Sequence, residues 1–389
     1  MGPLSTRLFT PRFFLMFGYS FTVFVSLFQL LPAAPYRIID LGGSTAVAGL
    51  FLGLLTYSSA LSAPLTGSLS DRIGHRRVLI AVSFVLAGFT ASYAFIGHYK
   101  VMLVVVFIHG FIWSGLLAAS SAYMTAIIPE SRRAEGLSYW GLASVLAIGA
   151  APAIGFWVYK HGWFTLCAEL TILNLTMGII AWQLPEDHAT ASTDAQNPAN
   201  PAASGKGVEW RVLGLSIGLA MISFGYGSLT SFSALFADQL GITPRSLFLS
   251  AMAVAILLSR LTIGRAVDRL GHRFVLTRAI IAPPIGLLIL AFAFGKVSFL
   301  IGALVFGAGF GLMHPAYSAY MMKHVAPSRR GAAFGAMLAA FDTGIGTGSS
   351  LMGLVIDQFG FRVGFGTAAI VAGIALPYFL IAEKKLGFE

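Results

Sequence analysis

Ionisable side chains inside long apolar segments are the residues of this sequence whose types and positions could do chemistry. A charged group surrounded by hydrocarbon is unfavourable unless it faces a water-filled cavity or a partner, so each is a candidate for binding a proton or a substrate. The candidates for a proton-coupling or substrate-binding role are Asp342, Glu169, Arg260, His109 and His314.

Asp342 stands out because small residues surround it in the run Phe341–Ser350. Burial favours the protonated form of a carboxyl group. We therefore predict that Asp342 is a proton-coupling or substrate-binding carboxylate. The alternative is a structural ion pair, or a position near the start of its helix.

Glu169 and Arg260 also have either a functional or a structural interpretation. Glu169 lies about seven residues inside an apolar segment and either functions there or reaches a nearby cation. Arg260 either holds an anionic substrate, neutralises Asp342, or forms a structural pair near the end of its segment.

His109 and His314 lie in two further apolar segments. Histidine titrates in the physiological range and can relay protons. The alternative for each is a hydrogen-bonded packing residue.

The elements that position these residues are apolar helices. Hydrophobic residues make up 57% of the 389 residues and charged residues only 10%, whereas soluble domains carry about a quarter charged residues. Crossing a bilayer takes about 20 apolar residues. We predict an all-α integral membrane protein with twelve transmembrane helices, at about 13–34, 45–66, 78–97, 101–127, 136–159, 163–184, 211–236, 247–267, 274–294, 298–322, 331–356 and 363–382.

A single long polar segment divides these helices into two sets of six. We predict an N-terminal bundle over residues 1–184, a cytoplasmic linker over 185–209 and a C-terminal bundle over 210–389. Placing both termini in the cytoplasm puts 18 Lys and Arg residues on that side and 6 on the other. This bias is the signal that orients membrane proteins, and short basic clusters between apolar helices do not indicate nucleic-acid binding.

The two halves repeat one another at a constant offset of 197 residues. Residues 67–76 (GSLSDRIGHR) match residues 264–273 (GRAVDRLGHR), and three further blocks align without gaps, at Gly110 with Gly307, 121–124 with 318–321, and 131–133 with 328–330. Parallel repeats of this kind are a transporter architecture.

The repeated motif has a physical interpretation as a latch on the cytoplasmic side. Its glycines permit close helix approach and a tight turn, and its aspartates can pair with arginines. The alternative is orientation plus turn geometry alone. The latch candidates are Gly67, Asp71, Arg72, Gly74, Arg76, Asp268, Arg269 and Arg273.

With these motifs the chain resembles the major facilitator superfamily over nearly its whole length. The resemblance implies two six-helix bundles around a central cavity, working by alternating access in a bacterial-type inner membrane. Among members, bacterial drug–proton antiporters and sugar-efflux proteins are the most similar. The sequence differs from those antiporters at two places. Val106 stands where many of them have an arginine, and only Pro152-x-x-Gly155 remains of their glycine-rich motif.

Helices one, four, seven and ten usually line the cavity in this superfamily. The resemblance therefore offers Tyr19, Gln29, Trp113 and Tyr226 as cavity candidates. Hydroxyls and aromatic rings with few charges suit neutral or amphiphilic ligands.

We therefore expect a secondary active transporter, coupled to protons and exporting a small drug-like molecule or metabolite. The alternative is an importer or exchanger of a small organic anion or sugar. A sensor or an enzyme is disfavoured, because no nucleophile–base pair, metal motif or phosphate-binding loop occurs, and the Gly344–Gly348 run reads as helix packing. We expect no cofactor and no metal, and a functional monomer.

Overall fold

The computed structural model describes residues 7–186, 210–270, 272–326 and 329–387, and in these ranges it leaves out the side chains of 134, 262–270, 272, 314, 322 and 330–332. Within the described residues all regular structure is helical. The helices are α1 (Pro11–Asp40), α2 (Thr45–Ile73), α3 (His75–Phe95), α4 (Tyr99–Ile127), η1 (Glu130–Arg132), α5 (Arg133–Tyr159), α6 (Trp163–Gln183), α7 (Trp210–Gln239), α8 (Leu247–Leu270), α9 (His272–Ala291), α10 (Lys296–Lys323) and α11 (Arg330–Lys385).

All twelve predicted segments fall on helices, and the predicted all-α membrane fold is confirmed. In the described residues ten helices are long and apolar enough to cross a membrane, and α8 has a shorter apolar part at Leu247–Leu261. The predicted helices 331–356 and 363–382 lie in one continuous α11. Gly360 interrupts it with φ 82° and ψ 168°, a backbone conformation that glycine adopts without a steric penalty, so α11 contains two crossing segments.

Helix ends follow local sequence signals. The Thr10 side chain accepts a hydrogen bond from Phe13 N at 3.2 Å, with Pro11 at the start of α1, and the Ser44 hydroxyl accepts one from Val47 N at the start of α2. Such side chains satisfy amide groups that the first helical turn leaves free. Gly74, with φ 97°, makes the turn between α2 and α3.

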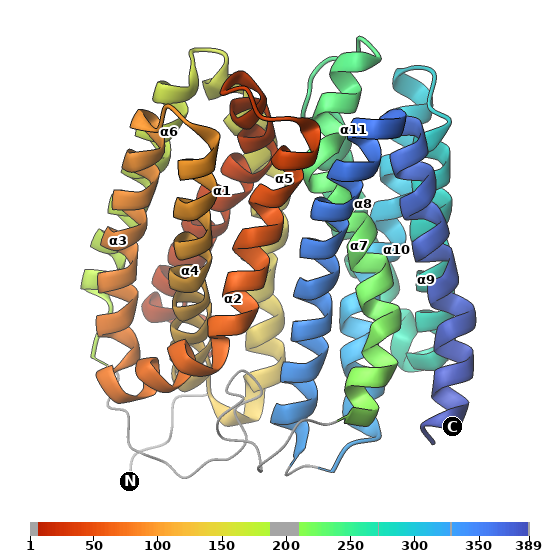
Figure 1. Ribbon diagram of the computed structural model, residues 1–389. Coiled ribbons are helices and arrows are strands. Elements are labelled where there is room, and N and C mark those ends of the chain that lie inside the picture. The colour runs from red at the N-terminus through yellow and green to blue at the C-terminus, as the bar shows by residue number, and fades with distance from the viewer. Residues whose placement is uncertain (1–6, 187–209, 271, 327–328, 388–389) are drawn as a thin grey trace, which may run out of the picture.

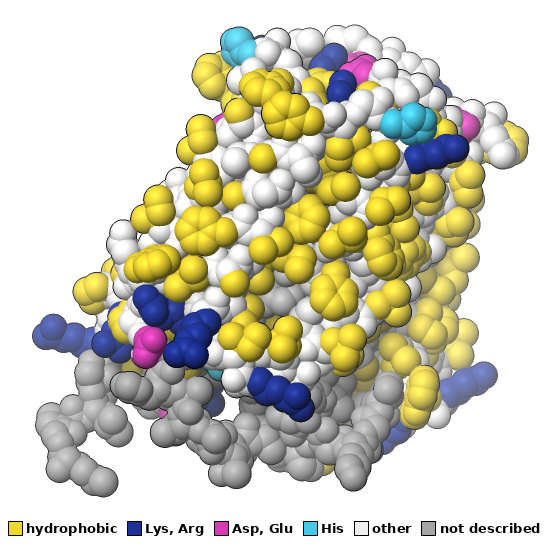
Figure 2. Space-filling model, turned by 60° about the vertical axis from the view of Figure 1, so that its left-hand side comes forward, with side chains coloured by type: hydrophobic (Ala, Val, Ile, Leu, Met, Phe, Trp, Pro, Cys, Tyr) yellow, Lys and Arg dark blue, Asp and Glu magenta, His cyan; other side chains and the backbone are white. Residues whose placement is uncertain are grey.

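The helices stand side by side with both termini at the same end of the molecule (Figure 1). We call that end the terminal end and the other the far end. Apolar side chains cover the middle of the face in Figure 2, and charged side chains gather toward its two ends. This distribution fits a surface whose middle faces lipid.

The segment of α11 before Gly360 is packed between α2 and α7 through alternating glycines. A Cβ added at Gly344 would lie 2.8 Å from Ala220 Cα of α7, and one at Gly348 would lie 2.6 Å from the Phe224 carbonyl carbon. At Gly346, on the opposite side, it would lie 3.2 Å from the Tyr57 ring of α2. The run is therefore a helix-packing surface, as its sequence indicated.

The α2–α11 contact joins the N-terminal helices to the C-terminal helices. Ser349 Oγ donates to the Gly49 carbonyl at 2.7 Å and also bonds Ser231 of α7 at 2.7 Å. Tyr57 Oη and Thr347 Oγ1 are 2.6 Å apart. At the far end, Thr45 N donates to Asp357 Oδ1 at 3.0 Å.

We predict that Gly49→Val weakens this contact, because a Cβ there would lie 3.1 Å from Phe232 and 3.2 Å from Gly353 Cα. Overpacking of this kind costs about 1–3 kcal/mol. The measurement is the thermal unfolding midpoint of the purified protein in detergent. Gly88→Val is the matched control, since Gly88 is exposed and has no atom within 4 Å of an added Cβ. Equal midpoints for the two variants would contradict the prediction.

Candidate functional site

Polar contacts between the halves also occur at the far end of the molecule, next to α1 and α7. Tyr36 of α1 donates to Asp238 Oδ2 of α7 at 3.0 Å. Arg245 forms an ion pair with Asp238 at 2.9 Å and lies 4.7 Å from the centre of the Tyr36 ring. Tyr159 of α5 donates to Asp40 beside this group at 3.2 Å. The contacts of Tyr36 with Asp238 and Arg245 join the two halves there.

Toward the terminal end, α2 and α11 carry exposed residues. Pro64 on α2 and Ala339 and Thr343 on α11 are exposed, although they continue the two helices past the buried Gly49–Tyr57 and Gly346–Ser349 contacts. Among the described residues, the hydrogen bonds and ion pairs that join the halves lie at Tyr36, Thr45, Gly49 and Tyr57 and their partners.

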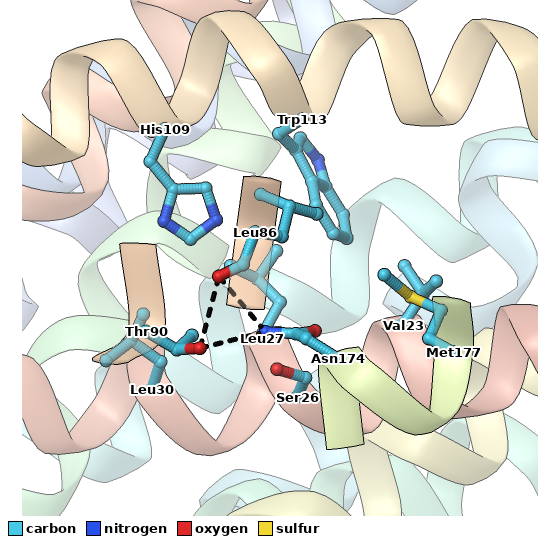
Figure 3. A pocket seen from close by; sticks show the side chains of 10 residues that line it. All are labelled: Val23, Ser26, Leu27, Leu30, Leu86, Thr90, His109, Trp113, Asn174 and Met177. Atoms are coloured by element: carbon cyan, nitrogen blue, oxygen red, sulfur yellow. Dashed lines mark hydrogen bonds between the residues drawn. The ribbon is translucent and has the colours of Figure 1, made fainter. Parts of the chain in front are cut away.

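A small cavity lies inside the N-terminal half, between α1, α3, α4 and α6 (Figure 3). Its volume is about 10 Å³, which is the space of about one water molecule. It is too small for a substrate. Its lining includes two predicted residues, His109 and Trp113, together with Thr90 and Asn174.

His109 is packed among aromatic rings. It is 4% exposed, its Nδ1 lies 3.2 Å from Tyr93 Oη, and its ring stacks on Phe89 with centroids 5.6 Å apart. This is the arrangement of the hydrogen-bonded packing alternative. A proton-relay role for His109 stays a prediction.

Asn174 and Thr90 form a polar group that sequence reasoning missed. Asn174 Nδ2 donates to Thr90 Oγ1 at 3.2 Å and approaches the Leu86 carbonyl at 3.5 Å, and Thr90 bonds Thr171. These residues tie α3 to α6 (Figure 3). A lone asparagine inside an apolar segment was the available signal.

All four cavity candidates point into their own half, and three of them pack against aromatic or hydroxyl side chains there. Tyr19 is fully buried, with its hydroxyl 3.1 Å from Ser83 Oγ of α3. Trp113 meets Phe24 edge to face at 5.9 Å. Tyr226 stacks on Phe310 with centroids 4.6 Å apart. Substrate contact by these residues stays a prediction.

The fourth, Gln29, meets the candidate Glu169. Gln29 Nε2 donates to Glu169 Oε1 at 3.0 Å between α1 and α6. Gln29 is fully buried. The structure thus joins two residues that the sequence analysis singled out separately.

Asp342 and Arg260 do not form the ion pair considered above. Asp342 is half-buried in α11, and within the described part of the chain it has no hydrogen bond or ion-pair partner. Arg260 is half-buried in α8 and donates its Nε to the Gly311 carbonyl at 3.0 Å, with no carboxylate partner among the described residues. The side chain of the candidate His314 lies outside the described residues.

Two described latch residues have partners within their own half. Asp71 pairs with His75 at 3.2 Å. Arg76 donates to the Trp182 carbonyl at 2.7 Å and lies 3.7 Å from Glu186. Gly67 is buried and Arg72 exposed. The side chains of Asp268 and Arg269 lie outside the described residues, so a latch between halves stays a prediction.

Arg273 forms a closed ionic cluster with Glu383. Its Nε and one terminal nitrogen each donate to a Glu383 carboxylate oxygen at 2.8 Å. Tyr320 donates to the same carboxylate, and Glu383 is fully buried. The repeat offset of 197 residues places Arg273, Tyr320 and Glu383 opposite Arg76, Tyr123 and Glu186. Extending the alignment to Glu186 would have found this cluster.

The family relationship follows from comparison with known proteins. The sequence profile described as Major Facilitator Superfamily matches residues 12–326 and 216–387. The chain belongs to the Major Facilitator Superfamily. It is a membrane transporter and not an enzyme, as the sequence predicted.

Relatives within the superfamily cover nearly the whole chain. The protein named "Uncharacterized MFS-type transporter YhhS" from Escherichia coli (strain K12) is 26% identical, over 92% of this chain and 89% of its own length. A protein named "Uncharacterized MFS-type transporter" from Pseudomonas aeruginosa (strain LESB58) is 30% identical, over 89% of this chain and 87% of its own length.

Solved structures show the same major facilitator fold. The nucleoside transporter NupG superposes with a TM-score of 0.79 at 17% identity, over 96% of this chain and 100% of NupG. A bacterial homologue of the human lysosomal transporter Spinster, in an inward-facing and occupied conformation, superposes with a TM-score of 0.74 at 15% identity, over 95% of each chain.

The duplicated ion pairs give a matched test in this major facilitator. Glu383→Gln should lower the thermal unfolding midpoint by several degrees, because the buried carboxylate holds Arg273 and Tyr320. Hydrogen bonds to charged groups contribute about 1.5–3 kcal/mol. Glu186→Gln should change it little, since Glu186 is 63% exposed and surface pairs contribute about 0–1 kcal/mol. A larger loss in Glu186→Gln than in Glu383→Gln would refute this assignment.

Proposed function

We propose that this transporter exports a small drug-like molecule or metabolite in exchange for protons, by alternating access, with Asp342 as the coupling carboxylate. The observation that carries the proposal is the isolation of Asp342 described above. A carboxylate inside a membrane helix without a cation is tolerated where water, a proton or a ligand reaches it. We infer the outward direction of transport from the resemblance of residues 67–76 to the motif of exporters.

The proposed cycle moves the two predicted bundles, residues 1–184 and 210–389, about the contact between them. We place both termini in the cytoplasm of a bacterial cell, by the bias of basic residues. The far-end contacts at Tyr36 and Thr45 then close the outer side. The exposed Pro64 and Thr343 belong to the side that opens inward.

Asp342→Asn should abolish transport driven by a proton gradient, reducing it at least tenfold, because an amide cannot take up and release a proton. The measurement is ethidium accumulation in everted vesicles after a pH gradient is imposed, with and without an uncoupler. Glu130→Gln is the control, since Glu130 is 81% exposed. Undiminished gradient-driven transport by the Asp342→Asn protein would remove the coupling role.

Arg260 favours a second function, the exchange of a small organic anion. Its Nε is bound to a carbonyl, while no carboxylate among the described residues neutralises its charge. Arginine presents several donors in a planar group that matches a carboxylate or phosphate.

Under this second function, Arg260→Gln should abolish anion exchange in reconstituted vesicles, and Asp342→Asn should leave it intact. The measurement is counterflow of radiolabelled carboxylates and phosphate esters, with Arg278→Gln as the control, because Arg278 is exposed and lies over the Phe274 ring. Exchange that survives in Arg260→Gln would exclude the anion site at α8.

A further inference from the structure

The contact between Gln29 and Glu169 leaves two buried oxygen atoms without a hydrogen bond. The amide nitrogen of Gln29 donates to Glu169 Oε1 at 3.0 Å. The two remaining oxygen atoms, Gln29 Oε1 and Glu169 Oε2, are both buried and both lack a hydrogen-bond donor. Two buried acceptors left on one amide–carboxyl pair are unfavourable, because each forgoes the bond it made in water.

A single proton on Glu169 would give both unpaired oxygen atoms a hydrogen bond. A carboxylic acid has an O–H donor that a carboxylate lacks. If Glu169 Oε2 carries the proton, it can donate to Gln29 Oε1 while Glu169 Oε1 accepts from Gln29 Nε2. The acid and the amide then satisfy each other in a closed ring.

Among the described residues, no cation pairs with Glu169 to favour its ionised form. The charged and titratable groups of α1, α3, α5 and α6 near this level make other contacts. Arg37 donates to the Ile96 carbonyl and lies over Trp163, and Tyr159 donates to Asp40. Tyr93 approaches His109, His161 meets Trp157, and Cys167 is a buried free thiol. None of these described groups forms a hydrogen bond or an ion pair with Glu169.

Gly155 of α5 closes the site on a third side. A Cβ there would lie 2.9 Å from Gln29 Cβ and 3.1 Å from Gln29 Cα. The glycine of the Pro152-x-x-Gly155 remnant therefore lets α5 lie directly against the Gln29 side chain. That close contact excludes water from the amide and fixes its position on α1.

We propose that Glu169 and Gln29 form a proton-binding site within the N-terminal half, occupied at neutral pH, in which the carboxylic acid and the amide share two hydrogen bonds. Loss of the proton leaves a carboxylate oxygen of Glu169 and the carbonyl oxygen of Gln29 buried without a donor at the α1–α6 contact. Proton binding at this site thus controls how firmly α1 holds α6. The site is separate from Asp342 and does not depend on its coupling role.

Infrared absorption of the purified full-length protein tests the site directly. At pH 7 the wild-type minus Glu169→Gln difference spectrum should contain the C=O band of a protonated, hydrogen-bonded carboxyl group. Glu169→Gln keeps the shape of the pair, because its amide can donate to Gln29 Oε1. The band should persist in Asp342→Asn, which leaves this pair untouched.

Gln29→Leu provides the second measurement. Removing the amide should shift the Glu169 C=O band to higher frequency, because the carboxyl group loses its partner, and this result stands even if Glu169→Gln fails to fold. A difference spectrum that shows only the loss of a carboxylate band would overturn the proposal. So would a protonated-carboxyl band that Gln29→Leu leaves in place. Neither result bears on ethidium transport by Asp342→Asn, so the two proposals fail separately.

Discussion

The close approach of α11 to two neighbours at once is the constraint on which the rest of the structure depends. Lipid provides no hydrophobic drive between helices, so contact between their surfaces and hydrogen bonds must hold them together. Gly344 and Gly348 lie four residues apart and therefore on one side of the helix, against α7, while Gly346 lies on the other, against α2. Because α2 belongs to the first six helices and α7 and α11 to the second set, this spacing also decides where the two halves meet.

Most of this fold could be predicted from the sequence, because a membrane helix is recognised by its length and apolar composition. The twelve predicted segments coincide with helices, and Gly344–Gly348 was interpreted as packing from its small residues alone. The sequence placed the break between the last two segments at residues 357–362, and the structure puts it at Gly360, with helix on both sides. One glycine with positive φ suffices for that turn, and a hydropathy pattern does not register it.

The candidate site was predictable residue by residue but not as a set of contacts. Gln29 and Glu169 are 140 positions apart, and only the rotation of α1 and α6 about their axes brings them together. Composition identifies a polar side chain in an apolar segment but does not give that rotation. The Glu383 cluster differs, because the repeat offset carries Arg76, Tyr123 and Glu186 onto its three members. There the sequence contained the contact, and a longer alignment of the two halves would have revealed it.

Polar side chains inside the helices differ in whether they have a partner of opposite charge. In the described N-terminal half, Asn174, Thr90, His109 and Gln29 all contact other polar groups of that half. In the C-terminal half, Asp342 and Arg260 have no partner of opposite charge among the described residues. A buried charge without such a partner persists only where water or a ligand can solvate it. This argument supports the proposed function, in which a transported molecule or ion interacts with the charged side chains of α8 and α11.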